Sequence, residues 1–140
     1  MLFARRARKI NRILIVEDEP LVAFDNEHLL RDAGYEIVAT VDTVAEATAY
    51  VGQHPVDLVL ADVNLSAGGD GTDVARAAQG MDVPLVFVTG ANLDGAAKMA
   101  MGVLAKPYNQ RDLLATIEAV EAKLAGKTPK RVPKGLTLFD

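Results

Sequence analysis

The chain has 140 residues, a mass of 14.9 kDa and a formal net charge of −4, which is the length of one domain rather than two. It contains no cysteine, so disulfides and thiolate metal sites are excluded. No apolar run approaches the roughly 20 residues that a membrane-spanning helix requires, and the apolar start is too short for a secretory signal. We therefore expect a cytoplasmic protein with no membrane partner.

The first eleven residues form a basic leader. Its cationic residues are Arg5, Arg6, Arg8 and Lys9, and Arg12 follows directly after it. Basic arms of this kind bind nucleic acid or membranes in some proteins. No aromatic residues are interleaved with the basic ones and no recognition-helix pattern follows, so we predict a solvated leader and no nucleic-acid partner.

Strand and helix patterns alternate between residues 12 and 125. Branched apolar runs flanked by charge indicate buried strands, and apolar residues at helical spacing indicate the helices between them. The first half predicts a strand at 12–17, a helix that ends at Gly34, a strand at 36–41, and a helix begun by the capping box of Thr43 and Glu46.

The second half continues the alternation and ends in a basic tail. It predicts strands at 57–61, 83–88 and 102–105, helices at 72–79 and 92–99, a glycine-rich loop at 62–71, and a last helix opened by Asn109 or Asp112. One apolar stripe follows in the last helix, from Leu113 to Leu124. The tail, residues 126–140, carries prolines and many basic residues, and we predict neither helix nor strand in it.

Five strands alternating with five helices predict an α/β fold, a doubly wound five-stranded parallel sheet with helices on both faces. Right-handed crossovers favour the flavodoxin-like strand order 2-1-3-4-5. In that order the first and third strands are neighbours. Glu17, Asp18 and Asp62 follow these two strands directly, so we expect them to converge at the carboxyl edge of the sheet.

Three carboxylates at one edge repel one another, and the usual remedy is a hard divalent cation such as Mg²⁺. Asp62 stands alone at the end of the central strand, so it is the carboxylate best placed to attack phosphorus as a nucleophile. Thr89 and Lys106 end the next two strands, where a hydroxyl and an ammonium would neutralise phosphoryl oxygens.

These strand ends resemble the motifs of bacterial two-component response-regulator receiver domains. The matching segments, which span about residues 12–125 in the expected order, are Ile15-Val16-Glu17-Asp18-Glu19-Pro20, Asp62-Val63-Asn64-Leu65, Val88-Thr89-Gly90 and Lys106-Pro107.

The resemblance implies a role for each of these strand-end positions. By this resemblance Mg²⁺ would be bound by Glu17, Asp18, Asp62 and the backbone carbonyl of Asn64. Asp62 would accept phosphate from a histidine kinase or histidine phosphotransferase. Thr89 and Lys106 would sense the phosphoryl group, and the peptide bond before Pro107 would be cis.

Two positions depart from the family pattern. The acidic pair is Glu-Asp where many members have Asp-Asp. Val103 stands three residues before Lys106, where these domains usually carry an aromatic switch residue, and Tyr108 is the only nearby ring. Phe87-Val88-Thr89-Gly90 further resembles the Phe-Ala-Thr-Gly motif of alphaproteobacterial single-domain regulators, with Val88 in place of alanine.

We therefore predict a single-domain response regulator that signals by protein contacts around its last strands and helices, or that shuttles phosphate. It would not be an enzyme beyond Mg²⁺-dependent self-phosphorylation and slow autodephosphorylation. One alternative is a Mg²⁺-dependent phosphohydrolase of the haloacid-dehalogenase type, although Asn64 stands where its second aspartate is needed. Another is a degenerate pseudo-receiver adaptor, which the intact site residues argue against. The downstream partner and any dimerisation stay open.

Overall fold

The computed structural model describes residues 10–65, 69, 71–90 and 96–139. Three predicted features lie wholly or partly outside these residues. They are the basic leader up to residue 9, the centre of the glycine-rich loop, and the first part of the helix predicted at 92–99. No helix in the described part of the chain is both long enough and apolar enough to cross a membrane.

The elements follow the predicted alternation closely. The strands are β1 (Arg12–Val16), β2 (Glu36–Val41), β3 (Leu58–Ala61), β4 (Leu85–Thr89), β5 (Gly102–Ala105) and β6 (Leu136–Leu138). The helices are α1 (Pro20–Asp32), α2 (Val44–Gln53), α3 (Gly71–Gly80), the 3₁₀ helix η2 (Ala96–Met99) and α4 (Gln110–Leu124).

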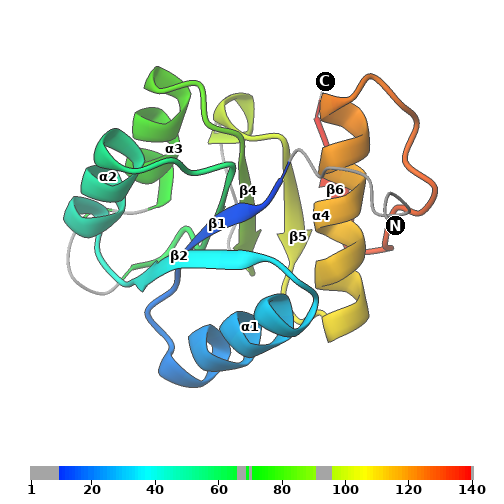
Figure 1. The fold of residues 1–140 in the computed structure, drawn as a ribbon, viewed down its shortest axis with the longest axis horizontal. Coiled ribbons are helices and arrows are strands. Elements are labelled where there is room, and N and C mark those ends of the chain that lie inside the picture. Colours follow the sequence, from blue (N-terminus) through cyan, green and yellow to red (C-terminus); the bar gives the residue numbers. More distant parts are fainter. Residues whose placement is uncertain (1–9, 66–68, 70, 91–95, 140) are drawn as a thin grey trace.

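The strands form one sheet in the order β2-β1-β3-β4-β5-β6 (Figure 1). The first five strands are parallel, and the predicted order 2-1-3-4-5 is confirmed. β6 adds a sixth strand that runs antiparallel to β5.

The prediction that the tail lacks regular structure is wrong for β6. Its three residues alternate Leu-Thr-Leu, which is too short a pattern to be distinguished from a loop by periodicity. What stabilises the strand is the edge of β5, where Leu104 pairs with Leu136 and Leu136 becomes buried. Only the tertiary fold supplies that edge.

The helix predicted at 92–99 lies only partly within the described residues, and its described part is not α-helical. Four α-helices are present among the described residues, and the described part of the fifth segment is the 3₁₀ helix η2. Its four residues make one tight turn, which is the usual length of a 3₁₀ helix.

Alternate side chains of the central strands feed two separate apolar cores, one on each face of the sheet. On one face Ile13 and Ile15 of β1 pack with residues of α1 and α4. On the other face Leu14 and Val16 pack with residues of α2 and α3. Figure 1 shows the same arrangement, with α2 and α3 on one side of the sheet and α1 and α4 on the other. The prediction of helices on both faces is therefore confirmed.

α3 begins in direct contact with the end of β3, and a glycine makes this possible. The backbone N–H of Gly71 donates a hydrogen bond to the carbonyl of Val63 (2.7 Å). A Cβ atom at position 71 would overlap the carbonyl oxygen of Asp62 and lie 2.8 Å from the Cα atom of Val63. The close approach fixes the backbone that carries Asp62.

We expect Gly71→Ala to destabilise the fold by about 1–3 kcal/mol, because backbone atoms must move to admit the methyl group. Gly80, at the other end of α3, is the matched control, since a Cβ atom there would meet nothing within 4 Å. Urea denaturation of Gly71→Ala and Gly80→Ala tests the expectation. Equal stability of the two variants would contradict it.

Candidate functional site

The candidate site lies at the carboxyl edge of the sheet, where β1, β3 and β5 end. Glu17 follows β1, Asp62 follows β3, and Lys106 follows β5. Backbone hydrogen bonds from each of these residues to the adjacent strand hold the strand ends level: Glu17 to Val41 (2.9 Å), Asp62 to Val16 (2.9 Å) and Lys106 to Thr89 (3.1 Å).

The ammonium of Lys106 bridges two of the carboxylates. Its Nζ atom donates to Oδ2 of Asp62 at 2.9 Å and to Oε1 of Glu17 at 3.0 Å. Only 4% of the Glu17 side chain, 11% of the Asp62 side chain and 23% of the Lys106 side chain are exposed, so these ion pairs are largely shielded from water. The position of Lys106 at a strand end predicts a contact with the phosphoryl group, and the structure adds that the ammonium also neutralises the carboxylate cluster.

The predicted convergence of the three carboxylates is confirmed. One oxygen from each of Glu17, Asp18 and Asp62 lies within 4.8 Å of the others. The group consists of carboxylates alone, which suits a hard cation that prefers oxygen ligands, such as Mg²⁺. The nitrogen and sulfur ligands that zinc sites favour do not occur in it.

Burial and ion pairing act in opposite directions on the charged groups. Burial raises the pKa of Glu17 above its ordinary value of 4.5, and the hydrogen bonds from Lys106 and from the Glu19 amide offset this only in part. Burial alone would lower the pKa of Lys106, but the hydrogen bonds to Asp62 and Glu17 outweigh it and the pKa is raised. Lys106 therefore stays protonated at physiological pH.

Both carboxylate oxygens of Asp62 accept a hydrogen bond. Oδ2 accepts from Lys106, and Oδ1 accepts from the backbone N–H of Asn64 at 3.2 Å. A carboxylate oxygen has about two lone pairs, so each keeps one for a metal ion or a phosphorus atom. The carboxylate is thus oriented from both sides and still able to react.

The remaining predicted residues lie on β4, on β5 and directly after β5. Thr89 is the last residue of β4, is 2% exposed and pairs with Ala105. The bond between Lys106 and Pro107 is cis, in agreement with the resemblance. Val103 is half-buried in the middle of β5, between Phe87 of β4 and Thr137 of β6, and packs against the core beneath α2 and α3.

One polar contact beside the site has no counterpart in the sequence patterns. The side-chain amide of Asn26, on α1, donates a hydrogen bond to the phenol oxygen of Tyr108 at 2.9 Å. Burial raises the pKa of Tyr108, so the phenol stays protonated. The contact joins α1 to the loop that follows Lys106. The two residues are 82 positions apart, and no local pattern links them.

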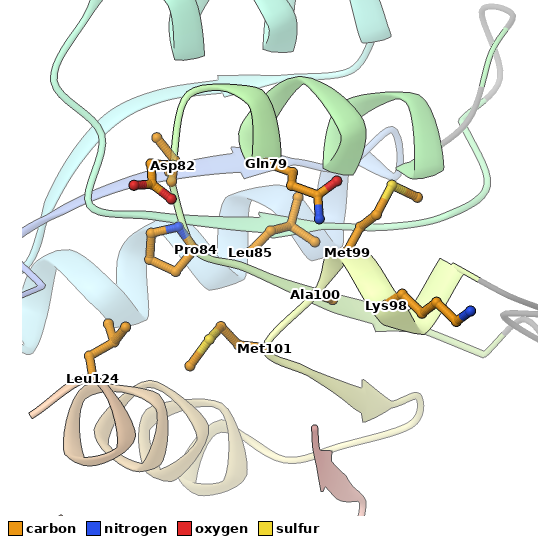
Figure 2. A pocket seen from close by; sticks show the side chains of 10 residues that line it. Gln79, Asp82, Pro84, Leu85, Lys98, Met99, Ala100, Met101 and Leu124 are labelled. Carbon is orange, nitrogen blue, oxygen red and sulfur yellow. The ribbon is translucent and has the colours of Figure 1, made fainter. Parts of the chain in front are cut away.

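A separate cavity of about 320 Å³ lies at the opposite edge of the sheet (Figure 2). Pro84 and Met101, which precede β4 and β5, line it together with Leu124 from the end of α4. The amino ends of the strands form this edge, so the cavity is not part of the carboxylate site.

Comparison with known proteins assigns the family. Residues 13–118 match the model of the response regulator receiver domain. The chain belongs to this family, and the resemblance seen in its motifs is confirmed at that level. The narrower resemblance to regulators with a Phe-Ala-Thr-Gly motif stays a prediction.

The chain is similar to part of several curated bacterial regulators. It is 35% identical over 113 residues to the transcriptional regulatory protein PdtaR of Mycobacterium tuberculosis, an alignment that covers 76% of this chain and 55% of the relative. It is 32% identical over 110 residues to the phyllosphere-induced regulator PhyR of Methylorubrum extorquens, covering 75% and 41%. The chain thus spans about half the length of the curated relatives it matches.

Solved structures share the fold. A CheY-like receiver domain from Methanospirillum hungatei is 26% identical with a TM-score of 0.75, covering 84% of this chain and 98% of that one. The response regulator TrrA of Thermotoga maritima, solved in complex with Mg²⁺ and BeF, is 26% identical with a TM-score of 0.72, covering 79% and 99%.

The raised pKa of Glu17 predicts a pH dependence of stability. The folded protein binds the Glu17 proton more tightly than the unfolded chain, so this contribution to stability is present at low pH and lost as the pH rises through the folded pKa. Glu17→Gln removes the titrating group. We expect the free energy of unfolding of Glu17→Gln to increase relative to that of wild type as the pH rises from about 4 to 7.

Urea denaturation at several pH values, with EDTA to remove divalent cations, measures this difference. Glu36→Gln is the control, because the side chain of Glu36 is 65% exposed. Wild-type and Glu17→Gln profiles that run parallel would contradict the expectation.

Proposed function

We propose that this receiver domain accepts a phosphoryl group on Asp62 from the phosphohistidine of a histidine kinase or histidine phosphotransferase. One observation carries the proposal: a nearly buried carboxylate at a strand end lies 2.9 Å from a protonated lysine, beside two further carboxylates. This combination places a nucleophile, a fixed cation and a metal-binding group at one point.

The transfer is a displacement at phosphorus. One oxygen of Asp62 forms the new O–P bond, the N–P bond of phosphohistidine breaks, and its electron pair returns to the imidazole nitrogen, which takes up a proton. Asp62 becomes a mixed anhydride. The hydrogen bonds from Asn64 and Lys106 hold the carboxylate in place, so little orientation is lost when it attacks.

The charge of the arriving phosphoryl group requires neutralisation. Lys106 supplies one cation from within the site, and Thr89 at the neighbouring strand end would supply a hydroxyl. Glu17, Asp18, Asp62 and the backbone carbonyl of Asn64 would hold Mg²⁺, which, when bound, neutralises phosphoryl oxygens. The complex of TrrA with Mg²⁺ and BeF supports a site of this kind in a protein of the same fold.

Phosphorylation would be read out by a protein partner through the surface around β5 and α4, since Lys106 joins these two elements. The phosphohydrolase alternative has less support. It requires a second carboxylate two residues after the nucleophile, and the neutral Asn64 stands there with its backbone amide committed to orienting Asp62. The pseudo-receiver alternative has less support because the carboxylates and the lysine are all in contact range.

Asp62→Ala is expected to abolish phosphorylation. Wild-type protein incubated with a small phosphodonor such as acetyl phosphate and Mg²⁺ should gain the mass of one phosphoryl group, as measured by intact mass spectrometry. Asp82→Asn is the matched control, since Asp82 is exposed and lies at the opposite edge of the sheet. Labelling of Asp62→Ala at the wild-type level would refute the assignment.

Asp18→Asn is expected to weaken Mg²⁺ binding by about tenfold, because a charged oxygen ligand is replaced by a neutral one. Isothermal titration calorimetry measures the affinity directly, without phosphorylation. Asp25→Asn, an exposed acid on α1, controls for the loss of one negative charge. The same affinity in both variants would show that Asp18 is not a ligand.

A further inference from the structure

The C-terminal segment lies on the outer edge of β5 as an added strand. Gly102 pairs with Leu138 and Leu104 pairs with Leu136 in antiparallel register. Two backbone hydrogen bonds extend the pairing at its ends: Ala105 donates to the carbonyl of Gly135 (3.0 Å), and Phe139 donates to that of Met101 (2.9 Å). β6 therefore occupies an edge that would otherwise present unpaired backbone groups.

A short stretch of chain attaches this strand to the domain. Residues 126–135, which link α4 to β6, contain two prolines and no helix or strand. Beyond the strand pairing, an exposed ion pair joins Arg131 to Asp112 on α4 (3.0 Å), and the ammonium of Lys123 donates to the carbonyl of Phe139 (2.6 Å). Leu136 is buried, the partly buried Leu138 packs against the same core, and Pro133 in the linker is buried as well. Ion pairs at the surface add little to stability, so the strand pairing and these three apolar side chains supply most of the attachment.

The edge of β5 is shaped to receive a strand. At Gly102 a Cβ atom would lie 2.6 Å from the backbone oxygen of Thr137, so a glycine is needed for the two backbones to approach this closely. Leu104, next along the edge, is fully buried and packs with Leu136 from the added strand. Leu138 packs against the same core from the other end of β6. The edge thus combines a close backbone approach with apolar contacts, the two features by which a sheet edge binds an extended peptide.

We propose that the outer edge of β5 is a strand-docking surface, that residues 136–138 are its tethered occupant, and that an extended segment of a partner protein replaces them. The partner segment would carry apolar residues at the two positions that are equivalent to Leu136 and Leu138. On the amino-terminal side of these it would carry a basic residue that pairs with Asp112, as Arg131 does. A tether of this length holds the occupant at a millimolar effective concentration. A partner strand that makes more backbone hydrogen bonds would outcompete it.

The proposal does not depend on phosphorylation of Asp62. Thr137→Pro tests it, because proline removes the backbone N–H in the middle of β6 and is not accepted within a paired strand. Thr128→Pro is the matched control, since Thr128 is exposed and lies outside any strand. The probe is a synthetic peptide with the sequence of residues 133–139, titrated into ¹⁵N-labelled full-length protein and followed by NMR, which measures millimolar affinities.

We expect the peptide to shift the amide signals of Gly102–Ala105 in Thr137→Pro and to bind at least tenfold more tightly than to wild type or to Thr128→Pro. Equal affinity for all three proteins would overturn the proposal. Hydrogen exchange supplies the second measurement. Faster exchange of the Ala105 amide in Thr137→Pro, with β1 and β3 still protected, supports a displaceable strand. Loss of protection in β1 and β3 would show that β6 is an integral part of the fold, and would also overturn it.

Arg131→Gln provides a variant in which the strand itself is unchanged. It removes only the ion pair with Asp112. We expect a smaller gain in peptide affinity and faster exchange of the Ala105 amide than in wild type. Unchanged exchange together with unchanged affinity would show that the linker does not hold the segment on β5.

Discussion

The contact of the Lys106 ammonium with Asp62 and Glu17 is the interaction around which the site is organised. Two shielded carboxylates this close would repel each other, and burial raises the pKa of Glu17. The lysine offsets both effects in part, and the carboxylates in turn raise its pKa. This mutual dependence requires that β1, β3 and β5 end at the same edge, which the parallel strand order of the sheet provides. The chemistry of the site is therefore a consequence of strand order.

The backbone around this contact is fixed by tight local packing. Gly71 allows α3 to begin against the carbonyl of Asp62, and the Asn64 amide orients the carboxylate from the other side. The Asn26–Tyr108 hydrogen bond ties α1 to the loop after Lys106. Nucleophile and cation are thus each attached to a helix as well as to a strand. Electrostatic groups held in this way need little rearrangement when charge arrives.

β5 connects the carboxylate site to the outer edge of the sheet, where β6 pairs. It carries Lys106 at its carboxyl end, Val103 in its middle and β6 along its outer edge. Val103 is β-branched and has few rotamers, so it lacks the freedom that an aromatic residue would have there. A strand on the edge of β5 lies one residue from the lysine, through the hydrogen bond between Ala105 and Gly135. The paired strand β6 and the lysine of the site are therefore both attached to the same short strand, β5.

The sequence by itself determined the alternation of strands and helices, the capping box at Thr43, and the polar residues that end each strand, because these are local patterns. The strand order followed from general rules of parallel sheets, and with it the convergence of Glu17, Asp18 and Asp62. The ion pair between Lys106 and Glu17, 89 residues apart, and the pairing of β6 with β5 were decided only by the tertiary structure. Both depend on groups that meet through packing, and a three-residue strand has no periodicity of its own to indicate where it will pair.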